Sequence, residues 1–284
     1  MATLLVFFNP SNSIRIVQNI LTVKHSLERS GIPVYIAELA FEAQSFVFAP
    51  AENILQVRSS SYMFYKENLI KALESHIPAT FTKLCMLDAD ILFDSPDWYS
   101  VISEKLETVD VCQPFTKTVF LNISFNPVYN CTNCVDNPTD NVIWGKEHSG
   151  HVWAFRRDWY TAAAMTDETV IGSGDEWIIR CLKDMPFPAD NKYPYYKNLI
   201  KVRENRRGSC PLTIYHLNHG SLTNRQYNTR HENIKEYMKE HSIHYINEVL
   251  DRRSDGIFEW KPEYRDSLNK IMLTYFKRRE DDGI

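Results

Sequence analysis

The chain opens with apolar and polar positions in an order typical of alternating strands and helices. An apolar run at residues 4–8 is followed by a turn-forming segment at 9–13 and then by Ile14, Val17, Leu21 and Leu27 near one helical face. Gly31 stands where a left-handed residue ends a helix, and a second apolar run covers residues 34–39. Strand, helix and strand within about forty residues predict a right-handed βαβ unit and a mostly parallel sheet.

The same pattern continues through the rest of the chain. Residues 60–74 fit a second helix that buries Met63, Leu69, Ile70 and Leu73, and residues 83–87 form a buried strand that runs directly into Asp88. Further strands are predicted at 109–113, 151–155 and 213–216, and further helices at 175–182, 230–240 and 262–278. The segment 114–144, rich in Asn, Pro and Thr, is predicted to be a long functional loop or lid. With no repeat or linker, the 284 residues predict one α/β domain.

Composition narrows the class of protein. A hydrophobic content of 44% and a net charge of -4 predict an ordinary globular protein with no general attraction to nucleic acid. No apolar stretch reaches about 18 residues, and no basic leader precedes the first apolar run, so we expect a cytoplasmic protein without a membrane span. The six cysteines are expected to be reduced thiols. Cys131 and Cys134 form a single Cys-x-x-Cys pair, for which a plain loop and a zinc or redox role both stay open.

The pair Asp88 and Asp90 is the first candidate for chemistry. The chain has only 9 glycines and neither a Gly-x-Gly-x-x-Gly turn nor a Walker-type loop, so a bound nucleotide needs another means of holding its phosphates. Carboxylates that clamp Mn²⁺ or Mg²⁺ provide one, and residues two apart in a strand face the same side. Asp-x-Asp arises by chance about once in a chain of this size, but here apolar residues flank it on both sides. A solvated turn with Asp90 as a helix cap is the alternative.

Several segments in a fixed order carry a resemblance to a known group. They are residues 7–10, 65–68, 86–93, 150–157, 172–175, 216–220, 225–230, 256–260 and 279–281. With these segments the chain resembles the GT-A-type glycosyltransferases over nearly its whole length. The resemblance implies one GT-A domain at 1–284 with a Rossmann-like, mostly parallel sheet. Residues 1–115 would bind the nucleotide and metal, and residues 116–284 would bind the acceptor.

The resemblance also implies a metal site. In enzymes of this type the last Asp of the acidic motif, here Asp90, binds Mn²⁺ or Mg²⁺, while Asp88 reaches the ribose or a metal-bound water. His219, just before Gly220, is similar to the His that completes the metal shell. His216 matches the position of a second ligand in galactosyltransferases of this fold, and an unrelated polar contact is its alternative.

The segment that contains Asp175 is similar to the glycine-plus-acid segment that supplies the catalytic base in inverting enzymes. A carboxylate within hydrogen-bond reach of the acceptor hydroxyl suits that task, although Asp175 could equally cap the helix that follows it. Glu176 is the next candidate, as a contact to the acceptor or sugar. If Asp175 is the base, the reaction inverts the anomeric carbon.

Other residues gain roles from the segments that surround them. Lys66 is a candidate for the donor phosphate or for a structural role, and Asn9 follows the first strand where it would meet the base or ribose. Trp153 and Trp177 could stack on a sugar face, with core filling expected for at least one of them. Arg225 and Arg230 are candidates for a phosphate clamp or for ordinary ion pairs.

The predicted function is that of a metal-dependent hexosyltransferase that moves a sugar from a UDP-sugar to a glycan or other hydroxyl acceptor. One rival is a haloacid-dehalogenase-like phosphatase, in which Asp88 attacks phosphorus and Asp90 acts as acid and base. Three features count against it: Leu92, the distance of the motif from the first residue, and the lack of a convincing later Asp pair to complete a Mg²⁺ site. A nucleotide-sugar binding protein without turnover is the second rival. The sequence leaves the sugar, nucleotide, acceptor, stereochemistry and oligomeric state open.

Overall fold

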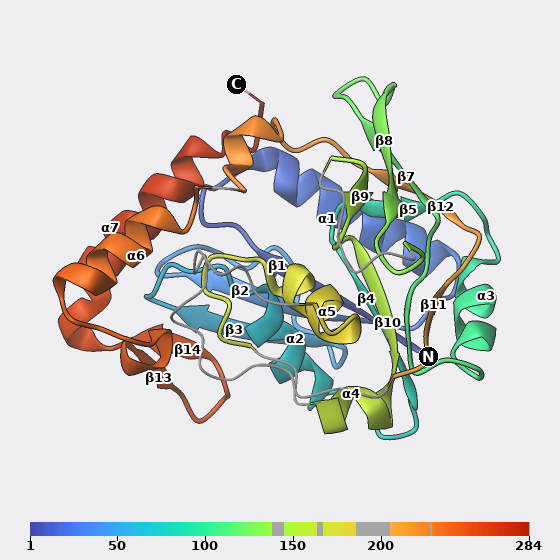
Figure 1. Cartoon of the computed structure of the whole chain (residues 1–284), viewed down its shortest axis with the longest axis horizontal. Coiled ribbons are helices and arrows are strands. Elements are labelled where there is room, and N and C mark those ends of the chain that lie inside the picture. The colour runs from blue at the N-terminus through green and yellow to red at the C-terminus, as the bar shows by residue number, and fades with distance from the viewer. Residues whose placement is uncertain (138–144, 164–166, 186–204, 228, 284) are drawn as a thin grey trace.

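The computed structural model describes residues 1–137, 145–163, 167–185, 205–227 and 229–283. They form a mixed α/β structure with a mostly parallel central sheet, as the sequence predicts (Figure 1). The strands of the central sheet are β1 (Ala2–Phe8), β2 (Val34–Phe41), β3 (Ile54–Ser59), β4 (Lys83–Leu87), β6 (Val111–Gln113), β10 (Val152–Arg156) and β11 (Arg207–Ser209). The α-helices are α1 (Ile14–Arg29), α2 (Lys66–Glu74), α3 (Trp98–Lys105), α4 (Arg157–Ala163), α5 (Gly174–Leu182), α6 (Glu232–Glu240) and α7 (Pro262–Arg278).

The central sheet has the strand order β11-β6-β10-β4-β1-β2-β3. Strands β1 to β4 run parallel to one another, whereas β10 lies antiparallel between β4 and β6. Two strands of this sheet, β10 and β11, come from residues 116–284. Both predicted halves of the chain therefore build the same sheet.

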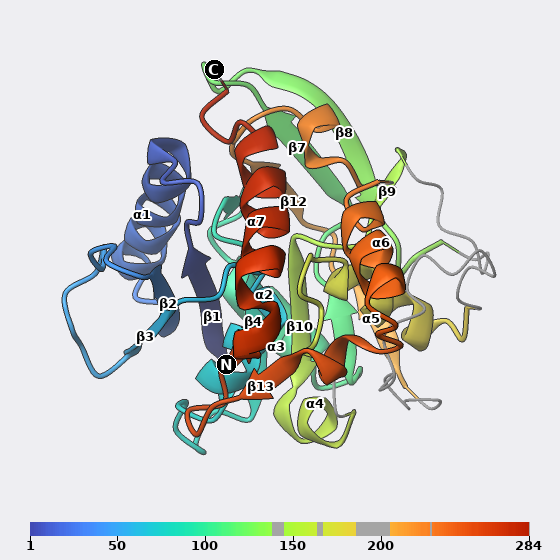
Figure 2. The same ribbon diagram turned by 90° about the vertical axis from the view of Figure 1, so that its left-hand side faces the viewer.

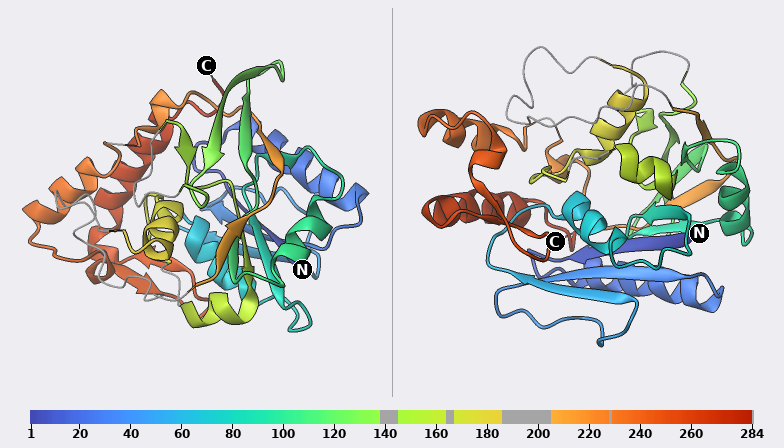
Figure 3. Two further views of the ribbon diagram at one scale, coloured as in Figure 1. Left: turned by 45° about the vertical axis from the view of Figure 1, so that its right-hand side comes forward. Right: turned by 90° about the horizontal axis from the view of Figure 1, so that it is seen from below.

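The two faces of the sheet are covered by different helices, as Figure 3 shows. Alternate residues of β1 point to opposite sides, so Leu4 packs with α2 and α5 while Leu5 packs with α1 and α3. Helices α6 and α7 lie side by side and extend the first of these layers (Figure 2). No helix in the described ranges is long and apolar enough to cross a membrane.

A second sheet stands beside the first and corrects one prediction. Its order is β5-β12-β7-β8-β9, from β5 (Ile91–Phe93), β12 (Thr213–His216), β7 (Lys117–Leu121), β8 (Pro127–Asn133) and β9 (Glu147–His148). The prediction of a long loop at 114–144 is wrong for residues 117–133, because β7 and β8 form a hairpin that projects from the body (Figure 1). Asn122 closes its turn by accepting hydrogen bonds from the backbone N–H groups of Ser124 and Asn126. Residues 138–144 of the predicted loop lie outside the described residues.

Local details confirm some predictions and correct others. Ser13 caps α1 by accepting a hydrogen bond from the N–H of Ile16, and Gly31 has a φ of 64° just after the helix. The predicted buried face of α1 is partly wrong, since Ile14 is 68% exposed and Leu21 is also exposed.

The second predicted helix starts later than residue 60. Helix α2 begins at Lys66, because tertiary hydrogen bonds hold the segment before it in a non-helical path. The N–H of Phe64 donates to the carbonyl of Val170, and the hydroxyl of Tyr65 donates to the carbonyl of Phe258. Met63 is buried as predicted, but it packs from this segment rather than from the helix. Lys66 consequently stands at the start of a helix.

The last part of the chain completes the fold with short elements. These are η1 (Thr223–Arg225), η2 (Ile246–Glu248), β13 (Leu250–Arg252) and β14 (Phe258–Trp260), where β13 and β14 form a small hairpin of their own. Trp260 of this hairpin is fully buried against the layer that contains α2 and α7.

Candidate active site

The Asp88–Asp90 segment leaves the sheet at the carboxyl end of β4, next to the carboxyl end of the parallel strand β1. A turn closes there, since the N–H of Ile91 donates to the carbonyl of Asp88. Strand β5 then pairs antiparallel with β12 so that Ile91 faces His216, and the N–H of Leu217 donates to the carbonyl of Asp90. This pairing brings Asp90 to the end of β12, far away in sequence.

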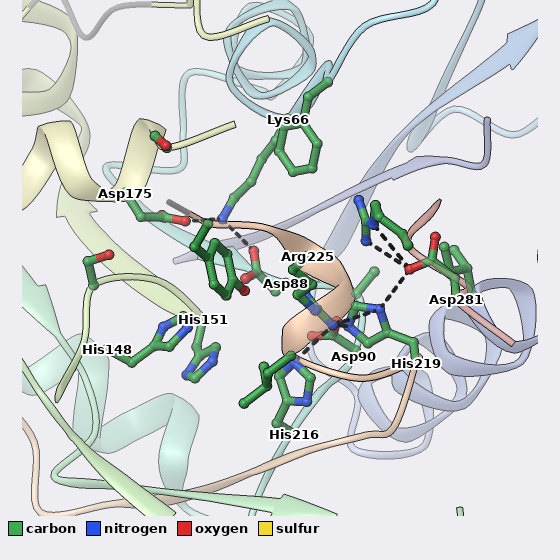
Figure 4. Close-up of a pocket in the computed structure, with 18 of the residues that line it drawn as sticks. Lys66, Asp88, Asp90, His148, His151, Asp175, His216, His219, Arg225 and Asp281 are labelled. Atoms are coloured by element: carbon green, nitrogen blue, oxygen red, sulfur yellow. Dashed lines mark hydrogen bonds and ion pairs between the residues drawn. The ribbon is translucent and has the colours of Figure 1, made fainter. Parts of the chain in front are cut away.

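Asp90, His216 and His219 form a cluster that fits a divalent cation (Figure 4). One ligand atom from each residue lies within 4.8 Å of the others. Oδ2 of Asp90 lies 2.6 Å from Nε2 of His219 and 3.7 Å from Nε2 of His216. Oδ1 of Asp90 is buried without a hydrogen-bond partner among the described residues, so the carboxylate has unused capacity. A carboxylate with two imidazoles is a donor set that suits transition metals such as Mn²⁺.

The charges of this cluster also suit a cation. Burial lowers the pKa of His216 to about 3, so its ring is neutral near pH 7 and keeps a lone pair for a metal. Burial works to raise the pKa of Asp90, but His216 and His219 hold it well below the usual range. Asp90 is therefore a carboxylate near pH 7 and can bind a cation.

Asp88 turns away from this cluster, contrary to the expectation that both carboxylates face one ion. Its Oδ1 lies 2.6 Å from Nζ of Lys66, and the same Nζ lies 2.8 Å from Oδ2 of Asp175. Residues two apart face the same side only in an extended strand. Because β4 ends at Leu87, a turn sets the directions of the Asp88 and Asp90 side chains instead. Burial raises the pKa of Asp88 to about 6, and Lys66 opposes that shift. Lys66 thus bridges Asp88 and Asp175.

Asp175 lies in the first turn of α5, where two nearby glycines allow close packing around the acidic side chains. A Cβ at Gly174 would lie 2.0 Å from Oε1 of Glu67, and one at Gly150 would lie 2.8 Å from Oδ2 of Asp175. Ser173, just before the helix, has a φ of 82° and makes no side-chain cap. A side chain at either position would clash with a carboxylate, that of Glu67 or that of Asp175, and this explains why both residues are glycine.

Glu67 is a half-buried acid that had no predicted role. It accepts a hydrogen bond from Oγ1 of Thr169, at 2.7 Å, and borders the cavity next to Lys66. Burial raises the pKa of Glu67 to about 7, with Lys66 opposing and Asp175 reinforcing that shift. Of the two neighbouring residues, Lys66 had a predicted role and Glu67 had none.

The other predicted residues make structural contacts. Glu176 borders the cavity, but its Oε1 lies 2.9 Å from Nη2 of Arg180. Asn9 exchanges two hydrogen bonds of 2.9 Å with the backbone of Ser13 and thereby holds the loop before α1. Trp153 is 2% exposed and donates to the carbonyl of Ser149, within the core. The base, ribose and sugar contacts assigned to these residues stay predictions.

A cavity of about 450 Å³ is bordered both by the Asp90 cluster and by the carboxylates of Asp88 and Asp175. Basic side chains also line it, those of Lys66, Arg225, Arg230 and Arg279. Nη2 of Arg225 lies 2.9 Å from Nδ1 of His219, so this cation stands directly beside the metal cluster.

Two features of the cavity had no predicted role. Asp281 lies with Oδ1 3.6 Å from Nδ1 of His219, and its segment was noted only through the resemblance. The rings of His148 and His151 stack 3.7 Å apart on the opposite side (Figure 4). No local pattern identified either feature, because neither spacing resembles a motif. Cys131 and Cys134 are buried free thiols, so the Cys-x-x-Cys question stays open.

Comparison with known proteins gives distant similarities. No protein-family model matches the chain, and no curated protein matches it. Among solved structures, a mutant of Drosophila beta1,4-galactosyltransferase 7 crystallised with manganese, UDP-Gal and xylobiose shows 15% identity and a TM-score of 0.38. That match covers 65% of this chain and 61% of that one, less than two thirds of its length.

Two other solved structures extend over more of their own chains. HddC from Yersinia pseudotuberculosis is 10% identical, with a TM-score of 0.35 and coverage of 76% and 93%. A glycosyltransferase involved in glycosylation of the major capsid of PBCV-1 is 12% identical, with a TM-score of 0.31 and coverage of 84% and 98%. At these identities and TM-scores, the functional conclusion rests on the geometry of the site.

Proposed function

We propose that this chain is a divalent-cation-dependent glycosyltransferase of GT-A type. It transfers a sugar from a nucleoside-diphosphate sugar, expected to be a UDP-sugar, to a hydroxyl of a glycan or other acceptor. One observation carries the proposal: a single cavity contains a cluster that fits a cation, basic side chains and the Lys66-bridged carboxylate of Asp175.

Asp90, His216 and His219 would hold the cation, Mn²⁺ or Mg²⁺. When bound, it neutralises charge on the diphosphate and so favours its departure. Arg225 and Lys66 add positive charge to the same cavity, which favours a ligand with several negative charges.

Asp175 accepts the proton of the acceptor hydroxyl as that oxygen attacks the anomeric carbon and the bond to the diphosphate breaks. The ion pair with Lys66 holds the carboxylate in place for this transfer. Attack from the side opposite the diphosphate inverts the anomeric configuration. Asp88, on the other side of Lys66, fixes the ammonium group between the two acids.

The first test measures binding. UDP, GDP and dTDP sugars are screened by thermal shift with Mn²⁺, with Mg²⁺ and with EDTA, since a ligand of the folded state raises its melting temperature. We expect a cation-dependent shift that Asp90→Asn abolishes. Equal binding in EDTA and in Asp90→Asn would contradict the proposal.

The second test separates binding from chemistry. Asp175→Asn should keep cation-dependent donor binding and lose transfer, measured as release of nucleoside diphosphate with acceptor present. A product that retains the donor's configuration, read by NMR, would rule out Asp175 as the base of an inverting reaction. Hydrolysis of p-nitrophenyl phosphate by the wild type but not by Asp88→Asn would favour the phosphatase alternative instead.

A further inference from the structure

The loop between β9 and β10 brings two histidines against the proposed base. Gly150 packs so closely on Asp175 that a Cβ there would lie 2.8 Å from Oδ2 of Asp175 and 3.3 Å from Cε1 of His148. His151 follows with a φ of 81°, which side chains other than glycine rarely adopt. Such backbone strain costs about 1–3 kcal/mol, and functional sites often retain it. The fold holds an imidazole at this point despite that cost.

The ring of His151 has one nitrogen without a partner. Nδ1 lies 3.1 Å from Oγ1 of Thr118, whereas Nε2 is buried with no hydrogen-bond partner in the part of the chain that the structure describes. His151 as a whole is 3% exposed and borders the cavity. An unpaired buried polar atom costs about 1–3 kcal/mol, so a ligand group that meets Nε2 regains that free energy.

A hydroxyl is the group that fits this nitrogen. In a neutral imidazole one nitrogen donates and the other accepts. If Nδ1 accepts from the hydroxyl of Thr118, Nε2 donates; if Nδ1 donates to that hydroxyl, Nε2 accepts. A sugar hydroxyl can accept in the first case and donate in the second. The fit therefore does not depend on the tautomer of His151.

His151 also lies at the right place along the cavity. Its ring centroid is 5.3 Å from that of His216 in the metal cluster, and its backbone carbonyl accepts from the N–H of Asp88. Gly150, the residue before it, touches Asp175. The ring thus lies between the groups proposed to hold the cation and the proposed base (Figure 4). A sugar whose bond to a diphosphate is about to break must occupy this interval.

We propose that Nε2 of His151 binds a hydroxyl of the transferred sugar, with its ring held in place by the stacked ring of His148. This inference rests on the proposed function and adds to it a residue that selects the sugar part of the donor. The ring stack, with an interplanar angle of 9°, fixes the plane of the His151 imidazole.

The test compares each nucleotide sugar with its own nucleoside diphosphate, by calorimetry with Mn²⁺. The probes are UDP-galactose and UDP-glucose against UDP, GDP-mannose against GDP, and dTDP-glucose against dTDP. For the sugar that the wild type binds, His151→Phe should weaken binding by about tenfold and leave the diphosphate's affinity within about twofold. His151→Gly, which relieves the backbone strain, provides a second variant if the first does not fold.

Thr118→Val is the matched control, because it removes the contact to Nδ1 and keeps Nε2. It should change the ratio of the two affinities by less than about threefold. An unchanged ratio in both His151 variants, an equal loss for sugar nucleotide and diphosphate, or an equal effect of Thr118→Val would each overturn the inference while the proposed function stands. A wild type that binds no probe would overturn the proposed function, and the inference with it.

Discussion

Lys66→Met removes the ammonium group that pairs with both Asp88 and Asp175. Breaking a buried ion pair costs about 3–5 kcal/mol, because a charge is left without its partner. The three side chains keep 13%, 26% and 22% of their exposure, so water screens part of this loss and the expected cost falls to about 2 kcal/mol. For a chain of this size, that corresponds to a melting temperature lower by about 4–8 °C.

The assay is thermal unfolding at pH 7.5 in EDTA, followed by circular dichroism. Lys71→Met is the control, since its ammonium group is half exposed and lies 3.3 Å from Asp167, which also pairs with Arg252. Its effect should stay below about 0.5 kcal/mol. Adding Asp175→Asn to Lys66→Met should restore about 1 kcal/mol, because it removes one of the two unpaired carboxylates. A Lys66→Met shift no larger than that of the control, or no recovery in the double variant, would refute the bridge.

Three further outcomes are expected. Asp90→Asn should weaken Mn²⁺ binding in calorimetric titration by more than about tenfold, whereas the exposed Asp97→Asn leaves it unchanged. Glu67, whose folded pKa of about 7 lies above the unfolded value, adds stability at low pH that is lost as pH rises through 7. Wild type should therefore lose about 1–2 kcal/mol between pH 5.5 and 8.5 in urea unfolding, and Glu67→Gln should flatten that slope. Gly220→Ala should lower the melting temperature more than Gly256→Ala does. Both glycines have positive φ, but a Cβ at Gly220 would lie 2.7 Å from the carbonyl oxygen of Glu280, whereas one at Gly256 meets nothing within 4 Å among the residues that the structure describes. Equal melting temperatures would contradict this.

The sequence predicted elements best where an apolar pattern meets a clear boundary. The strand at 83–87 and the helix at 262–278 have the observed bounds, because Asp88 ends the first and Pro262 begins the second. The β7–β8 hairpin escaped prediction because its turn depends on the side chain of Asn122, which composition alone reads as loop. The spacing of apolar residues along the chain indicates which side chains are buried, but it gives no information on local hydrogen bonds of this kind.

The candidate site was predictable only in part, for a similar reason. The sequence named Asp90, His216 and His219, yet their proximity depends on the pairing of β5 with β12, which no spacing along the chain encodes. The direction of Asp88 depends on where β4 stops, a matter of one residue. His151 acquires its position from antiparallel pairing of β10 with β4, which places it beside Asp88.

The C-terminal segment lies against both the start of α1 and His219 of the metal cluster, and this arrangement ties the site to the fold. Oδ1 of Asp282 accepts a hydrogen bond from Oγ of Ser13, at 2.7 Å, at the start of α1. Asp281, next to it, lies against His219, and Gly220 leaves room for the backbone of the same segment. A carboxylate beside an imidazole that would bind a metal fixes the orientation of the ring. The position of His219 consequently depends on contacts from α1 and from the C-terminal segment, so loosening either should weaken cation binding before it unfolds the sheet.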